Sequence, residues 1–341
     1  MLSLVQLGSN PRLEQIISEL NITPLDPESD LRGRRILFAV AVDEAGPDPS
    51  FYAFLRRLGR KRNCLSGSTA CLVVDGATEL HTKSAAQELV LAANMAGCRF
   101  PGRPVVEATG SLYNQHIQAR NLGLSWQETY RWRVRDLVQR MEDFQPPKFR
   151  RPKVLLIHAS DQKRSNTLAM GRAVCARLED RCDVREIQLL NGTVYDCRGC
   201  GYQACLHFSQ DNSCFYGGVV AREVRPAIRE ANLLLVLCPN YNDALGANLV
   251  ALINRRTALV VQKDLSDTYV AAVVVSGYSG GDIVARQLLG AMSLNRGCIL
   301  PPGFCLMQTA HDPGDAMKAF GVEALVEQFA VRLREELILD D

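Results

Sequence analysis

The clearest candidate for chemistry is a polar loop that separates an apolar run, residues 154–157, from a helical pattern. Its polar side chains are Ser160, Ser165, Asn166 and Thr167. Backbone N–H groups at a helix N-terminus, joined by nearby hydroxyls, can bind a phosphate. The dinucleotide fingerprint G-x-G-x-x-G is absent here, so we expect a site for one terminal phosphate. The alternative is that Ser165, Asn166 and Thr167 only cap the helix.

A second candidate is a cluster of cysteines between residues 197 and 214: Cys197, Cys200, Cys205 and Cys214. In a reducing compartment such a cluster suggests a metal site more than disulfide bonds. Four thiolates can hold a [4Fe–4S] cluster or a zinc ion. The third interpretation is that they hold no metal or form a redox-active thiol pair. Several of the other eight cysteines lie in apolar contexts and are expected in the core.

Two further apolar runs, residues 233–237 and 270–275, predict buried strands. The first ends in Pro239-Asn240-Tyr241-Asn242, and the second ends in a loop that contains Gly277, Gly280 and Gly281. A helical pattern follows each loop. Alternating buried strands and helices predict a doubly wound parallel sheet, whose ligands bind outside the carboxyl ends of the strands.

In this order, the motifs resemble a known family. Residues from about 153 to 300 are similar to the flavodoxin-like NAD(P)H-dependent FMN reductases, which include iron–sulfur flavoproteins. The resemblance is carried by four elements: Ser160 with Ser165-Asn166-Thr167, Pro239-x-Tyr241, Asn254-Arg255 in place of an acidic–Arg pair, and Gly277 with Gly280-Gly281. Three features depart from the family: Ala159 replaces a glycine, Asp161 adds a carboxylate beside the expected phosphate, and four residues rather than two separate Cys200 from Cys205.

The resemblance implies an α/β, flavodoxin-like domain that binds FMN and uses NAD(P)H as cosubstrate. The loop hydroxyls and amide would hold the FMN phosphate, and four residues would line the isoalloxazine ring: Pro239, Asn240, Tyr241 and Asn242. Gly277, Gly280 and Gly281 would let the backbone approach the ring and its ribityl tail. Tyr241 is the candidate catalytic residue, either as a stacking wall or as a proton donor.

The implied reaction is hydride transfer from NAD(P)H to FMN, and then to flavin, quinone or another small acceptor. Two alternatives stay open. One is an iron–sulfur flavoprotein electron carrier, in which the four clustered cysteines bind a [4Fe–4S] cluster and a protein redox partner exchanges electrons. The other is a binding or regulatory protein on an inert flavodoxin-like scaffold. Family members commonly cover the flavin with a neighbouring subunit, which implies a homo-oligomer.

The length of 341 residues allows about two domains. Prolines at 146, 147 and 152 interrupt the helical pattern and predict a linker over residues 146–152. We therefore expect an FMN-binding flavodoxin-like domain at residues 153–341 and a second α/β domain at residues 1–145. A single helix is expected from Asp315 to Leu337.

The first domain echoes the second. Residues 36–40, 71–75 and 104–111 follow the order of the three later strands, with residues 1–30 as a helical lead-in. This order predicts a degenerate flavodoxin-like copy, and the alternative is an unrelated α/β domain. Because residues 43–49 contain Asp43, Glu44 and Asp48 where a phosphate loop would stand, we expect no cofactor in this domain.

Charge and hydropathy exclude several classes of function. A net charge of +2 without a basic stripe gives no support to nucleic-acid binding. No apolar run approaches the roughly 18 residues of a membrane span. The N-terminus lacks the pattern of a signal peptide, so a cytoplasmic location is expected.

Overall fold

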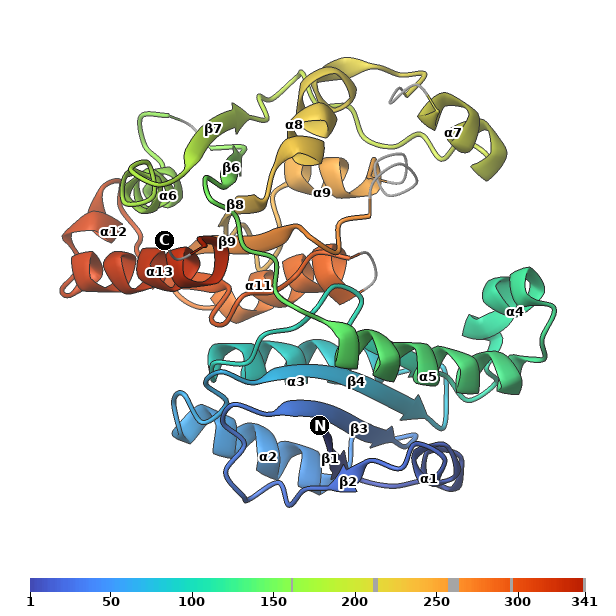
Figure 1. Cartoon of the computed structure of the whole chain (residues 1–341). Helices are drawn as coiled ribbons and strands as arrows, with labels where there is room; N and C mark the ends of the chain where they lie inside the picture. Colours follow the sequence, from blue (N-terminus) through green and yellow to red (C-terminus); the bar gives the residue numbers. More distant parts are fainter. Residues whose placement is uncertain (161, 211–213, 257–263, 295–296, 340–341) are drawn as a thin grey trace. The chain divides into compact units, whose positions relative to one another are not determined.

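A computed structural model describes residues 1–160, 162–210, 214–256, 264–294 and 297–339. The chain divides into two compact units, Met1–Gln145 and Pro146–Asp341. Each unit contains a five-stranded sheet, and helices connect its strands (Figure 1). Among the helices of the described residues, none has the length and apolar character needed to cross a membrane.

The second unit has the strand order of flavodoxins. Its strands are β6 (Lys153–His158), β7 (Asp183–Gln188), β8 (Leu233–Pro239), β9 (Tyr269–Ser276) and β10 (Cys305–Thr309). They pair in parallel in the order β10-β9-β8-β6-β7. Numbered within the unit, this is the order 2-1-3-4-5, in which a flavin binds between the first and third strands. The predicted flavodoxin-like fold is confirmed.

The burial of each strand explains whether its sequence is a continuous apolar run. All eight residues of β9 and the first six of β8 are buried, as an interior parallel strand requires. In contrast, three of the six residues of β7 are exposed, because this strand lies at the edge of the sheet. Edge strands therefore lack the continuous apolar run that marks β6, β8 and β9.

Helices complete the second unit: α6 (Asn166–Ala176), α7 (Tyr202–Ser209), α8 (Arg225–Glu230), α9 (Ala247–Asn254), α11 (Gly281–Leu289), α12 (Asp315–Lys318) and α13 (Val322–Leu337). The prediction of one helix from Asp315 to Leu337 is wrong. The chain leaves helical geometry at Ala319, with ψ 141°, and Gly321 adopts a left-handed φ of 76° before α13 begins.

The first unit repeats this connectivity. Its strands are β1 (Leu2–Leu7), β2 (Thr23–Pro24), β3 (Arg35–Val42), β4 (Thr69–Gly76) and β5 (Val105–Ala108). Their order is β2-β1-β3-β4-β5, which is again 2-1-3-4-5. The same order in both units is what the degenerate-copy hypothesis predicts.

The expectation of a helical lead-in over residues 1–30 is wrong. These residues contain β1, α1 (Pro11–Ser18) and β2. Strand β1 buries Leu2, Leu4, Val5 and Leu7. The predicted pairing of residues 36–40, 71–75 and 104–111 with β6, β8 and β9 is therefore wrong by one strand, and the counterparts of β6, β8 and β9 are β1, β3 and β4. Consequently, residues 43–49 correspond to the loop after β8, and residues 8–10 correspond to the expected phosphate loop.

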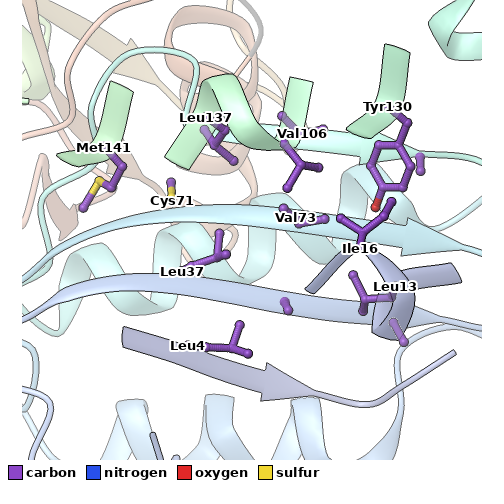
Figure 2. Close-up of a cluster of buried hydrophobic side chains, with 14 of the residues drawn as sticks. Leu4, Leu13, Ile16, Leu37, Cys71, Val73, Val106, Tyr130, Leu137 and Met141 are labelled. Atoms are coloured by element: carbon purple, nitrogen blue, oxygen red, sulfur yellow. The ribbon is translucent and has the colours of Figure 1, made fainter. Parts of the chain in front are cut away.

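One apolar cluster lies between the first sheet and two of its helices, α1 and the helix over Trp126–Asp143. The helices α2 (Pro49–Arg60), α3 (Thr82–Met95), α4 (His116–Leu122) and α5 (Trp126–Asp143) follow in chain order. Figure 2 shows Leu137 and Met141 of α5 near Cys71 of β4, with Leu37 of β3 in the same cluster. The amphipathic pattern of α5 therefore serves to cover this sheet.

An arginine occupies the carboxyl edge of the first sheet. Arg12, in the first turn of α1, pairs with the buried carboxylate of Asp75 at 2.9 Å. It also donates to the carbonyl oxygens of Thr109 and Gly110. A cavity of about 350 Å³ lies beside this pair and is also lined by Asp43 and Asp48. The carboxylates of Asp43 and Asp48 would disfavour a phosphate in this cavity. The expectation that this unit holds no flavin stays a prediction.

Candidate functional site at the carboxyl edge of the second sheet

Ser160 is held by its backbone immediately after β6. Its N–H donates to His158 Nδ1 at 3.2 Å, and its carbonyl oxygen accepts from Gln188 Nε2 at 2.9 Å. The Ser160 side chain is 3% exposed, and its Oγ has no hydrogen-bond partner among the described residues. A buried hydroxyl without a partner is costly unless a ligand satisfies it. Its neighbour Asp161 lies outside the described residues.

The start of α6 supplies further donors. Ser165 is the N-cap, and its Oγ accepts from Leu168 N at 3.1 Å, so its capping role is observed. Backbone N–H groups in the first turn of a helix have no helical partners. Thr167, in the same turn, is buried. This turn and the Ser160 hydroxyl make a plausible anion site together.

Asn166 has a different role from the one expected. Its Oδ1 accepts from Gly314 N at 2.8 Å, and its Nδ2 donates to Asp312 O at 2.8 Å. The side chain therefore fastens the start of α6 to the loop after β10. We expect the backbone N–H of Asn166, rather than its side-chain amide, to donate a hydrogen bond to a phosphate.

The loop after β8 is a tight turn. Asn242 and Asp243 have φ values of 53° and 57°, and Tyr241 pairs with Ala244 across them. Two left-handed central residues are typical of a type I′ turn. Tyr241 is 60% exposed at the start of this turn, directly after the Pro239-Asn240 pair. Its ring is therefore available to a ligand at this edge.

Asn240 joins this turn to the loop after β9. Its Nδ2 lies 3.2 Å from Ser276 Oγ and 2.9 Å from the carbonyl oxygen of Ser279. Its Oδ1 accepts from Asp243 N at 2.8 Å. The side chain of Asn240 thus holds the loop after β8 and the loop after β9 together.

The loop after β9 approaches the same turn closely. Gly280 has a φ of 81°, and a Cβ at this position would overlap the carboxylate of Asp243. Gly277 lies beside His311, whose ring is 5.1 Å from that of the exposed Tyr278. Gly281 begins α11.

The structure brings the predicted flavin residues to one edge. They lie at the end of β8, as Pro239 does, or after β6, β8 or β9. The parallel pairing of these strands carries their carboxyl ends to the same side. This edge includes the point between β6 and β8 where the strand order reverses, and open α/β sheets bind ligands there.

The family comparison agrees with this geometry. Residues 152–312 match the family model of NADPH-dependent FMN reductase. The resemblance inferred from the motifs is therefore confirmed for this FMN-reductase segment, which spans a little under half of the 341 residues. It contains every residue predicted to contact the flavin.

Solved structures are similar to about half of this chain at low sequence identity. An azoreductase from Bacillus anthracis str. Sterne is 15% identical, with 54% of this chain and 99% of that chain covered and a TM-score of 0.40. An FMN-dependent NADH-azoreductase from Bacillus anthracis str. Ames Ancestor, in complex with FMN, is 12% identical, with coverages of 53% and 99% and a TM-score of 0.37. No curated protein matches the chain. The family model supports the resemblance of residues 152–312 to FMN reductases, and the strand order supports the flavodoxin-like fold.

The clustered cysteines lie away from regular strands. Cys197 and Cys200 are exposed in the loop after β7, Cys205 is on α7, and Cys214 follows that helix. All four line one cavity of about 190 Å³. Within the described ranges, however, no three His, Cys, Asp or Glu side chains form a group that could hold a metal ion. As placed, the cysteines do not fit the expected iron–sulfur or zinc centre.

Arg255 organises the cysteine segment. Its buried guanidinium donates to Gly217 O at 2.6 Å and to Tyr195 O at 3.2 Å. Burial by itself would raise the pKa of Cys214. The hydrogen bonds with Arg255 and with the Tyr216 backbone, together with the positive charges of Arg255 and Arg225, outweigh burial, and the pKa is lowered. The arginine noted beside Asn254 in the sequence therefore acts on this loop.

The remaining cysteines are mostly core residues. Seven of the eight are buried, and Cys64 is partly buried. Burial raises the pKa of Cys71 and of Cys175 to about 12, so these thiols stay protonated. Their expected role as small apolar side chains is supported.

Sequence reasoning missed four residues that shape the site: His158, Gln188, Asp243 and His311. A histidine at the end of a buried apolar run is a usable signal, because burial requires partners for both ring nitrogens. Asp243 follows Asn242, and adjacent Asn and Asp residues are typical of tight turns. Gln188 and His311 reach the site through strand pairing and loop contacts that have no local signature.

The close approach at Gly280 gives a test of this geometry. We expect Gly280→Ala to destabilise the protein by about 1–2 kcal/mol for the left-handed φ and by a further ~1–3 kcal/mol for displacing Asp243. The matched control is Gly321→Ala, which has a φ of 76° and no atom within 4 Å of the new Cβ. Urea unfolding measures both variants. Equal destabilisation would show that the approach of the two loops has no energetic weight.

Proposed function

We propose that the chain is an FMN-dependent oxidoreductase that transfers a hydride from NAD(P)H to FMN and then to flavin, quinone or another small acceptor. The match to NADPH-dependent FMN reductase supports the general class. The proposal adds the bound cofactor, the residues that hold it and the small-molecule acceptor.

The observation that carries the proposal is the buried, unpartnered Ser160 hydroxyl beside the start of α6. A phosphate would accept from this hydroxyl and from the free N–H groups of the helix, and the helix dipole favours its charge. The residues present therefore fit the phosphate end of FMN. The cavity in the first unit is lined by three aspartates and lacks this combination.

When bound, the flavin accepts and donates the hydride, and the protein contributes binding and orientation. Ser160 and the first turn of α6 would anchor the phosphate. Gly277, Gly280 and Gly281 would let the backbone approach the ring and its ribityl tail. The exposed Tyr241 would form a wall against the ring and exclude water from one face.

Cofactor analysis tests the proposal directly. We expect the purified protein to be yellow and to release a single equivalent of FMN, without FAD, on denaturation. The protein should oxidise NADH or NADPH when a quinone or free flavin is present. Two equivalents of FMN per chain would contradict the expectation that the first unit holds no cofactor. Absence of bound FMN after FMN is added would contradict the proposed function.

The Ser160 hydroxyl gives a sharper prediction. Ser160→Ala should weaken FMN binding by about 1.5–3 kcal/mol, because a hydrogen bond to a charged phosphate is lost. Riboflavin, which lacks the phosphate, should bind both proteins equally. The free energy of unfolding of the cofactor-free variant should not fall, since no internal hydrogen bond is removed. Flavin fluorescence titration measures the affinities, and equal loss for both ligands would place the phosphate elsewhere.

The cysteine cavity favours a second candidate, an electron carrier that works with a protein redox partner. Its four thiols come from two loops and a helix around one cavity. The arrangement described above does not fit a metal, so no electron path is assigned through it. The two candidates differ in their acceptor: a small molecule for the enzyme and a protein for the carrier.

Metal analysis under anaerobic conditions separates these candidates. We expect substoichiometric iron and sulfide, because the cysteines do not converge on a metal position among the described residues. The measurement is iron and acid-labile sulfide per chain, with a chain carrying Cys197→Ser and Cys200→Ser as the control. About four irons and four sulfides per chain, lost in the control, would instead support the electron carrier.

A further inference from the structure

His158 lies between the expected phosphate site and the partly exposed ion pair of Glu186 with Arg172. It is the last residue of β6, and its side chain is fully buried. Nδ1 lies 3.2 Å from Ser160 N, and Nε2 lies 3.1 Å from Glu186 Oε1. Because a backbone N–H can only donate, Nδ1 must accept. The ring proton is therefore on Nε2 and is donated to Glu186.

Glu186 is itself fixed by an arginine. Arg172 on α6 donates to its two carboxylate oxygens at 2.9 and 2.7 Å. This pairing lowers the pKa of Glu186, which stays charged. Burial lowers the pKa of His158, and this effect outweighs the opposite influence of Glu186, so the imidazole is neutral at neutral pH. A continuous network thus runs from Arg172 through Glu186 and His158 to Ser160.

We propose that His158 is a positioning residue for FMN, which holds the Ser160 backbone so that its hydroxyl faces the phosphate. This inference rests on the proposed function. Only Ala159 separates the two residues, so the orientation of Ser160 depends on how its N–H and carbonyl oxygen are bonded. Gln188 holds the carbonyl oxygen, and His158 holds the N–H.

The direction of these hydrogen bonds distinguishes two ways in which His158 could affect FMN binding: by holding the Ser160 backbone, or by attracting the phosphate with a positive charge. A neutral imidazole gives the phosphate no Coulomb attraction, and its one N–H points to Glu186. Protonation would put a second donor on Nδ1, opposite the Ser160 N–H, and the bond that holds the loop would be lost. FMN binding should therefore weaken in acid, although a positive charge near a phosphate would strengthen it by attraction alone.

Two variants of His158 test the role. In His158→Asn, the side-chain oxygen can replace Nδ1 as the acceptor, whereas His158→Leu has no acceptor. At neutral pH we expect the Kd for FMN to rise about tenfold in His158→Leu and by less than about threefold in His158→Asn. The Kd for riboflavin should stay the same in all three proteins, because the effect acts on the phosphate.

The pH profile gives a second readout that does not need the leucine variant to fold. Because burial lowers the pKa of His158, the difference should appear only below the ordinary histidine pKa of about 6.5. As the pH falls from there, wild-type protein should lose more FMN affinity than His158→Asn, whose side chain does not titrate. The phosphate of FMN also titrates near pH 6, but this change is common to both proteins and cancels in their ratio. Tighter binding in acid for the wild type relative to His158→Asn would overturn the inference.

The outcomes keep the two proposals apart. If wild-type protein prefers FMN to riboflavin and Ser160→Ala removes the preference, the phosphate site stands. The inference is then wrong if His158→Leu keeps the preference or if wild type and His158→Asn share one pH profile. If wild-type protein does not bind FMN, the proposed function fails and the inference fails with it. Nitrogen-15 shifts of the His158 ring should also report the Nε2–H tautomer.

Discussion

A parallel sheet with helices between its strands leaves one edge for chemistry. In the second unit, the strands β6, β8 and β9 pair side by side in one direction, so their following loops meet. Buried strands cannot carry polar ligand-binding groups in their middle without a cost. Hydroxyls, amides and glycines therefore gather where the strands end. The contacts of Asn166 and Asn240 depend on this convergence, because each joins a loop to another loop distant in sequence.

The sequence predicts the interior strands of the second unit well, since each is a continuous apolar run. The edge strand β7 and the first strand β1 have no such run, and β1 was mistaken for part of a helical lead-in. At the site, Ser160 and the start of α6 are recognisable from local residue types. The contact of Asn166 with the loop after β10 spans 146 residues, and no local pattern encodes it. The cysteine spacing suggested a metal, but spacing alone does not bring sulfur atoms together.

The two units share one strand order but have different side chains at the carboxyl edges of their sheets. In the second, the loop after β6 ends with an unpartnered hydroxyl. In the first, the helix after β1 carries Arg12, whose guanidinium is bonded to Asp75 and to carbonyl oxygens of the neighbouring loop. An internal ion pair thus satisfies the groups that a ligand would otherwise meet. The shared strand order therefore does not by itself assign the same chemistry to both edges.

The shared strand order also affects how the chain folds. Neighbouring domains of one topology can exchange equivalent segments while both are incomplete, and such misassembly is a typical failure of multidomain proteins. The sequences of the equivalent strands limit this exchange: β1 reads Leu-Ser-Leu-Val-Gln-Leu, whereas β6 reads Lys-Val-Leu-Leu-Ile-His. In the second sheet, β1 would lack the imidazole that bonds Ser160 and Glu186. Divergence between the halves thus helps each sheet to select its own strands.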